Sequence, residues 1–335
     1  MLNARGLAWM LLAVASVLGC DEEKPEPSDP LAGISMPGDK QKILDTINPA
    51  KEKPYQGPTG AVAGRVTIKG DTAPPPREPS GLVDPQCRAG VEFYQSAFRT
   101  GPGRTAADVL VAVTGYSGFL PAREASVLVT IDGKCRYDRR TVVATYGQTI
   151  QVRNEGPRPF NPQLRGSRAS ALLVIPPQGE PVSLYPEAPG RFLLQDAAFD
   201  YMAAQVYILK YSTFDVTGLD GEFSIGRIPP GEVLVSAFLP SIGVTVEKRV
   251  TIEPGKTKKQ DFELQFDAEE YAERLRQSEK EFKERLERRS ATAVREEGLE
   301  FSPPAASALK QEEEAVPSAP PSSSTRVGGG EPPRN

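Results

Sequence analysis

Few side chains in this sequence could carry out catalysis or bind a metal, and the residue type that is absent restricts the possible chemistry most. The 335 residues include 44 Asp and Glu residues and three cysteines but no histidine. Histidine is the usual general base near neutral pH and the commonest metal ligand. Its absence excludes Ser-His-Asp and Cys-His triads, zincin motifs and histidine-containing zinc or copper sites. We therefore expect no enzyme, no cofactor and no metal site.

Without histidine, an enzyme would have to work through carboxylates, Lys or Tyr, and Asp196 with Asp200 is one acidic pair that could do acid–base chemistry. Acidic residues are abundant in this chain, and no neighbouring residue type singles out this pair. A carboxylate in a surface turn is the ordinary interpretation, with an enzyme that uses carboxylates as the remote alternative.

Cys20 ends a segment with the layout of an export signal. Arg5 precedes an apolar run over residues 7–18, which is shorter than the roughly 20 residues that span a bilayer. Residues 17–20, Val-Leu-Gly-Cys, resemble the lipobox of bacterial lipoproteins, in which the cysteine receives diacylglycerol. We expect a signal peptide over residues 1–19 and a membrane-anchored chain on the periplasmic side or the cell surface. Ordinary cleavage after Ala15, which leaves Cys20 as a free thiol, is the alternative.

Export would place Cys87 and Cys135 where a disulfide can persist. We predict that they pair and fix a long loop over residues 84–105. Two separate buried thiols are the alternative, because a sequence does not show whether two Cα atoms come within bonding range.

The region 60–266 is rich in short runs of β-branched residues separated by glycine and proline, a pattern typical of a β-sandwich. The expected strands cover residues 61–69, 107–114, 126–131, 141–145, 149–154, 171–175, 181–184, 190–194, 204–210, 221–225, 233–239, 244–252 and 260–266.

Residues 62–70, the cysteines near 87 and 135, and residues 146–161 resemble in order a family of exported bacterial proteins. That family joins a cupredoxin-like domain to a carboxypeptidase-regulatory-like module. Its copper ligands are two histidines, a cysteine and a methionine. Aligned on Met202, this chain has Phe160 and Phe199 at the histidines and Asp196 at the cysteine. The resemblance implies a lost copper site whose rings pack as core.

Residues 214–231 resemble the module's signature, in which a tight turn, a core aromatic and a Pro-Pro-Gly connection follow in order. The resemblance implies a transthyretin-like sandwich without catalysis of its own. We therefore expect an all-β chain: signal peptide 1–19, disordered tether 20–58, degenerate cupredoxin-like domain 59–212, regulatory-like β module 213–266, charged α-helix 267–299 and disordered tail 300–335.

The helix after residue 266 carries opposite charges at helical spacing and a narrow apolar stripe. A charged single helix and a helix that docks a partner are both open.

The leading hypothesis is a non-enzymatic lipoprotein that acts as a structural or interaction scaffold for an envelope protein or polysaccharide. The formal charge of −4 gives no reason to expect nucleic acid. The alternative is a carbohydrate-binding module with exposed aromatic rings, for which the candidates are Phe93, Tyr94, Tyr116, Phe119 and Tyr185.

Overall fold

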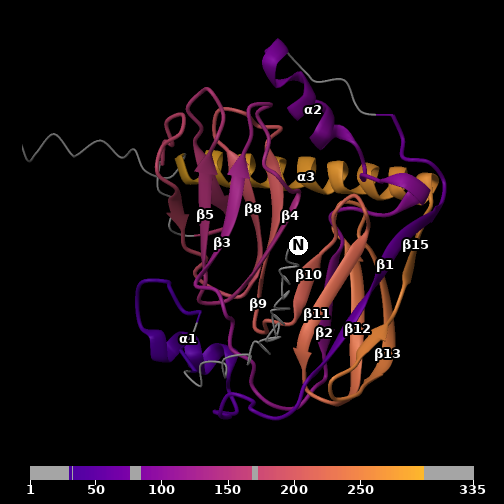
Figure 1. Cartoon of the computed structure of the whole chain (residues 1–335). Helices are drawn as coiled ribbons and strands as arrows, with labels where there is room; N and C mark the ends of the chain where they lie inside the picture. Colours follow the sequence, from indigo (N-terminus) through magenta and orange to yellow (C-terminus); the bar gives the residue numbers. More distant parts are fainter. Residues whose placement is uncertain (1–29, 32, 76–83, 168–172, 298–335) are drawn as a thin grey trace, which may run out of the picture. The chain divides into compact units, whose positions relative to one another are not determined.

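The computed structural model describes residues 30–31, 33–75, 84–167 and 173–297 (Figure 1). These residues fold mainly into β-sheets, which confirms the expected all-β class. The chain divides into one compact unit that ends at Ala272 and a second unit from Glu273. Cys20 and the signal segment, the start of the expected strand 171–175 and the tail 300–335 lie outside the described residues.

The first hydrophobic core, called core one below, lies between two sheets built from the middle of the chain. One sheet has the order β3-β5-β7 and the other has the order β4-β9-β8-β6. Their bounds are β3 Ser126–Ile131, β4 Thr141–Thr145, β5 Thr149–Asn154, β6 Pro162–Arg165, β7 Val182–Leu184, β8 Gly190–Asp196 and β9 Ala203–Leu209. The pairs β3–β5 and β4–β9 are parallel, so each sheet mixes strand directions.

The second core, core two, also lies between two sheets. β1 pairs with β11, β14 and β15 in one sheet, and the other has the order β10-β2-β12-β13. Their bounds are β1 Gly60–Gly70, β2 Leu110–Thr114, β10 Phe214–Val216, β11 Glu222–Ile228, β12 Gly231–Leu239, β13 Val244–Ile252, β14 Thr257–Lys259 and β15 Phe262–Phe266. The two sets of strands are visible as separate groups in Figure 1.

The expected boundary between residues 212 and 213 does not separate the two cores. β1 and β2 belong to core two, although they precede every strand of core one. In β1, Val66 pairs with Phe262 and Ile68 with Leu264, so its apolar residues complete the sheet of β15. Partners nearly 200 residues apart leave no signal in a local pattern, which is why the motif order suggested the wrong division.

The expected tether 20–58 is wrong for residues 33–58, because they contain the helix α1 (Lys40–Ile47). Asp39 caps it by accepting hydrogen bonds from the backbone N–H groups of Gln41 and Lys42. Ile43 and Ile47, one helical turn apart, are buried in core one. Burial of two isoleucines one helical turn apart thus stabilises a helix in a segment whose average composition is polar and rich in proline.

The expected loop 84–105 also holds regular structure. The short turns η1 (Pro85–Cys87) and η2 (Pro102–Arg104) flank the helix α2 (Arg88–Gln95), whose Val91 and Phe93 are buried. Strands β6, β10 and β14, of three or four residues each, are too short to leave a clear periodic pattern.

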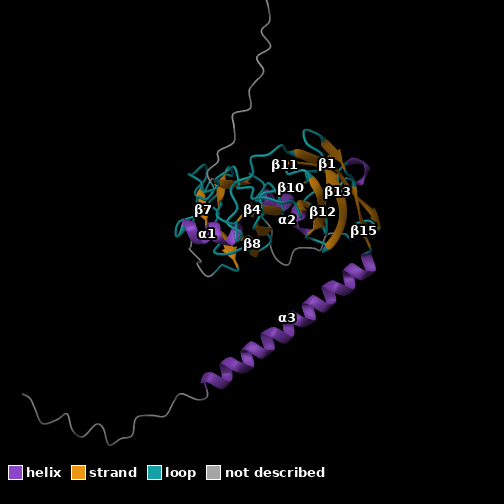
Figure 2. Cartoon of the chain, turned by 90° about the horizontal axis from the view of Figure 1, so that it is seen from below, coloured by secondary structure: helices purple, strands orange, loops and turns teal. Residues whose placement is uncertain are grey.

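The C-terminal helix α3 spans Ala268–Glu297, close to the expected 267–299 (Figure 2). Asp267 caps it through the N–H groups of Glu269 and Glu270, and the ring of Tyr271 lies 5.6 Å from that of Phe266. No helix in the described part of the chain has both the length and the apolar character needed to cross a bilayer.

Cys87 and Cys135 form a disulfide, as predicted, with their Cα atoms 5.1 Å apart. Both residues are buried in core one, so the bond attaches the start of α2 to the turn after β3.

Replacing both cysteines, Cys87→Ala with Cys135→Ala, should lower the free energy of unfolding by about 2–4 kcal/mol, because the bond closes a long loop and restricts the unfolded chain. Urea denaturation measures the change. As a control, a reducing agent should destabilise the wild type and leave the double variant unchanged. Equal stability of the wild type and the double variant in the absence of reducing agent would contradict the prediction.

Candidate functional site

The four residues aligned with copper ligands do come together in core one. Asp196 ends β8, Phe160 precedes β6, and Phe199 and Met202 lie in the turn between β8 and β9. Phe160, Asp196 and Met202 are fully or almost fully buried, and the rings of Phe160 and Phe199 lie 5.6 Å apart. The turn is closed by Met202 N–H donating to Phe199 O, and by Asp196 N–H donating to Met202 O.

The carboxylate of Asp196 accepts three backbone hydrogen bonds. Its Oδ1 accepts from the N–H groups of Ala198 and Phe199 at 2.9 and 3.0 Å, and its Oδ2 accepts from Asn161 N–H at 2.6 Å. This carboxylate therefore closes one turn and holds the strand β6 beside it. Asp200, its expected partner in acid–base chemistry, is exposed. The surface-turn interpretation therefore fits Asp200 but is wrong for Asp196, which is buried because its oxygens are satisfied by backbone groups.

Three tyrosines adjoin this turn. The ring of Tyr201 lies 6.0 Å from that of Phe199 and 6.1 Å from that of Tyr94, and Tyr94 Oη accepts a hydrogen bond from Tyr137 N–H. The hydroxyl of Tyr137 is buried without a hydrogen-bond partner. Burial raises the pKa of the Tyr137 hydroxyl well above its ordinary value and that of Tyr201 to about 12.

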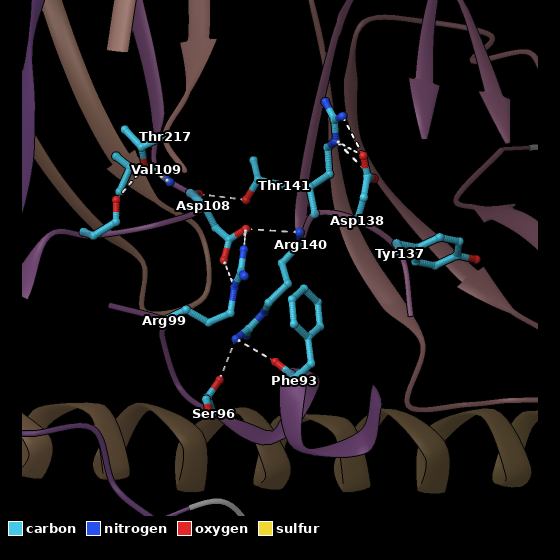
Figure 3. Close-up of polar contacts among 12 residues, drawn as sticks. Phe93, Ser96, Arg99, Asp108, Val109, Tyr137, Asp138, Arg140, Thr141 and Thr217 are labelled. Atoms are coloured by element: carbon cyan, nitrogen blue, oxygen red, sulfur yellow. Dashed lines mark hydrogen bonds and ion pairs between the residues drawn. The ribbon is translucent and has the colours of Figure 1, made fainter. Parts of the chain in front are cut away.

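The second buried carboxylate, Asp108, lies just before β2 at the junction of the two cores (Figure 3). Arg99 donates two hydrogen bonds to it, both at 2.7 Å, in a bidentate ion pair. The backbone N–H of Arg140, next to β4, donates to Oδ1 at 3.1 Å. We call this set of contacts, with those of the Asp108 backbone, the Asp108 junction.

The backbone of Asp108 takes part in the same junction. Its N–H donates to Thr217 O, after β10, and its carbonyl accepts from Thr141 Oγ1 at the start of β4. Thr217 Oγ1 accepts from Val109 N–H and donates to Ala106 O. β4 belongs to core one and β2 and β10 to core two. One residue therefore connects strands of both cores.

The guanidinium of Arg140 extends the junction to α2. It donates to Ser96 O at 2.8 Å and to Phe93 O at 3.4 Å (Figure 3). Burial lowers the pKa of Arg140, and the nearby carboxylate of Asp108 opposes that shift. The guanidinium of Arg99 lies over the ring of Phe93, 4.4 Å from its centroid. The junction thus fixes α2 as well as the two cores.

The sequence patterns did not point to the Asp108 junction. The available signal was one carboxylate inside the apolar run 106–113, where a buried charge requires a cationic partner. That partner, Arg99, lies in the segment expected to be a loop, and Thr217 lies more than 100 residues away.

The five rings proposed as a sugar-binding platform do not form one. Phe93 and Phe119 are buried, Tyr94 packs against core one and Tyr116 against core two. Tyr185 is the exposed member, at 44%. The described residues contain no group of three or more Cys, Asp or Glu side chains placed to hold a metal ion.

No protein-family model and no curated protein matches the chain. Part of it is similar to solved cupredoxin structures. Amicyanin from Paracoccus versutus is 20% identical over 29% of this chain and 96% of its own, with a TM-score of 0.22. A purple cupredoxin from Nitrosopumilus maritimus is 16% identical over 24% of this chain and 98% of its own, with a TM-score of 0.21. The similarity concerns a cupredoxin-like fold of one part of the chain.

Asp108→Asn should lower the free energy of unfolding by about 3 kcal/mol, because it leaves the partly buried Arg99 without its anion. Asparagine keeps the shape of the side chain and tolerates the positive φ of 65° at this position. The control is Glu232→Gln, which breaks the exposed ion pair with Arg249 and should change stability by less than about 0.5 kcal/mol. Equal effects of the two substitutions in urea denaturation would contradict the structural role of Asp108.

Tyr137→Phe should raise the free energy of unfolding by about 1 kcal/mol at neutral pH, because it removes a buried hydroxyl without a partner. The raised pKa means that the folded state holds this proton more tightly than the unfolded state. Stability is therefore lost as the pH rises above the unfolded value of about 10. The variant should lose less stability than the wild type between neutral pH and about pH 10.5. Tyr185→Phe, at an exposed ring, is the control and should change neither the free energy of unfolding at neutral pH nor its loss at high pH. A Tyr137→Phe protein that is less stable than the wild type at neutral pH would refute the prediction.

Proposed function

We propose that the chain is a non-enzymatic lipoprotein of the bacterial cell envelope, anchored through Cys20, that acts as a structural or interaction scaffold. One observation supports this proposal most. Among the described residues, the buried carboxylates are Asp108 and Asp196, and both are occupied by hydrogen bonds from groups that hold elements of the fold together. A catalytic carboxylate needs access to a reacting group, and these two are committed to the fold.

The resemblance to cupredoxin-like and carboxypeptidase-regulatory-like proteins fits the same proposal. Phenyl rings at Phe160 and Phe199 have no lone pair for a metal, and the remaining thioether of Met202 is a weak ligand. We infer that the residues at the former ligand positions now stabilise the turn between β8 and β9. The chain would then retain the sandwich as a rigid body and use its surface to contact an envelope component.

The anchor is tested by producing the full chain in a bacterium that processes lipoproteins. Mass spectrometry should find a mature chain that begins at Cys20 and carries the added mass of a diacylglycerol, and the protein should sediment with membranes. Cys20→Ala should be released to the soluble fraction. The variant with Cys87→Ala and Cys135→Ala is the matched control and should stay membrane-bound. A membrane-bound Cys20→Ala protein would contradict the anchor.

The scaffold role is tested by chemical crosslinking in intact cells, followed by purification of the anchored chain. A defined adduct with an envelope protein or polysaccharide should form with the wild type and be reduced for Cys20→Ala at equal expression. Absence of any adduct with the anchored chain under several crosslinkers would contradict a scaffold role.

A further inference from the structure

The helix α1 borders a cavity of about 420 Å³. Four residues of the helix and its C-terminal end belong to the wall, and their spacing of three and four positions places them on one face: Gln41, Leu44, Asp45 and Asn48. The rest of the wall comes from the chain before and after the helix: Pro30, residues 51–54 and Gln56. The volume falls within the range of about 300–1,000 Å³ that is typical of small-molecule sites.

The polar side chains of this helical face are occupied by contacts within the wall. Gln41 Nε2 donates to Asp45 Oδ1 at 2.9 Å. Asn48 Nδ2 donates to Glu52 O at 2.8 Å, and Asn48 Oδ1 accepts from Glu52 N–H at 3.0 Å. These hydrogen bonds leave a cavity surface that is mostly apolar. Such a surface favours a ligand with hydrocarbon rather than polar groups.

Contacts with the rest of the compact unit hold both parts of the wall in place. Ile43 and Ile47 of α1 are buried in core one, and Tyr55 N–H donates to Phe119 O at 2.8 Å. Pro54 forms a β-bridge with the same residue, Phe119. The cavity therefore exists before a ligand enters, which lowers the conformational entropy that binding costs.

The charged side chains of the wall balance one another in number. The wall has two carboxylates, Asp45 and Glu52, and two ammonium groups, Lys51 and Lys53. Its formal charge is therefore zero, which gives no preference for an anion or a cation. The binding free energy of a ligand with a long hydrocarbon chain would come from removal of that chain from water.

We propose that this cavity binds one acyl chain of a membrane lipid, with the head group at the opening. The supply of the lipid rests on the proposed anchor. Cys20 and Pro30, which is part of the cavity wall, are ten positions apart. This part of the wall therefore stays within about 36 Å of the lipid-bearing sulfur, the length of ten fully extended residues. An anchored chain would hold the cavity close to the bilayer from which the acyl chain comes.

Isothermal titration of the Cys20→Ala chain tests the cavity without detergent, which would compete for an apolar site. The probes are octanoate, decanoate and laurate, which share a carboxylate and differ in chain length. Each step of two methylene groups should tighten binding by roughly tenfold, because the cavity removes the added groups from water. Equal affinity for the three acids, or no binding of laurate at micromolar concentration, would overturn the proposal.

A substitution in the wall locates the binding. Leu44→Asn should weaken laurate binding by at least about tenfold, because it places an amide in the apolar surface of the cavity. Its control is Leu219→Asn, at an exposed leucine outside the cavity, which should leave laurate binding unchanged. Equal binding by the two variants would contradict a site beside α1.

A tryptophan reporter gives a second reading that does not depend on how well Leu44→Asn folds. The sequence has one tryptophan, Trp9, within the expected signal peptide. Gln56→Trp in the Cys20→Ala chain places a tryptophan in the cavity wall at an exposed position, and its emission should move to shorter wavelength as laurate binds. Leu219→Trp is the control and should show no shift. Equal shifts at the two positions would indicate binding outside the cavity and overturn the proposal.

The same chain separates the acyl-chain site from the anchor and from a second copy of the protein. Because Cys20→Ala lacks the proposed anchor, failure of the anchor test is distinguishable from failure of laurate binding. Analytical ultracentrifugation provides the other comparison. A Cys20→Ala dimer that Leu44→Asn converts to a monomer, together with no laurate binding, would assign the cavity to a second copy and overturn the acyl-chain proposal.

Discussion

The ion pair between the buried Asp108 and the partly buried Arg99 is the interaction on which the arrangement of the two cores depends. A charge removed from water is costly unless it is paired and hydrogen-bonded. Asp108 meets this condition because Arg99 binds both of its oxygens, and the backbone of Arg140 donates to one of them. These partners come from different parts of the chain, so the carboxylate is satisfied only when both cores and α2 are in place.

Asp196 shows the same use of a carboxylate on a smaller scale. Its three backbone hydrogen bonds connect β6 and β8 with the turn that follows β8. Around it, the rings of Phe160 and Phe199 and the side chain of Met202 fill the space. Asp196, which was aligned with a cysteine ligand, is thus a fully buried point of local structural support.

The sequence predicted the features that depend on local pattern. Runs such as 126–131 and 244–252 coincide with β3 and β13, and the end of the sandwich at Phe266 is followed by the charged helix α3. The pairing of Cys87 and Cys135 was also predictable, because the chain has three cysteines and Cys20 was assigned to an expected lipid anchor. The helix α1 was missed because it is stabilised by the packing of its Ile43 and Ile47 against residues far along the chain in core one, which a local composition does not show.

Features that depend on contacts between distant segments were not predictable in the same way. The pairing of β1 with β15 and the meeting of Asp108 with Thr217 each join residues more than 100 positions apart. Phe160, Asp196, Phe199 and Met202, grouped in the sequence by a resemblance, do lie near one another in core one. The packing of these rings was expected. The three hydrogen bonds of Asp196 were not, because most aspartates lie at the surface and nothing in the sequence showed that this one is buried.

Native-state hydrogen exchange is the measurement that tests the coupling of the two cores most directly. Amides of β9 in core one and of β12 in core two should exchange with the same free energy of opening in the wild type, because neither core loses its structure while the Asp108 junction holds. In Asp108→Asn the two free energies should separate. Two different opening free energies in the wild type, unchanged by the substitution, would contradict a fold that depends on this junction.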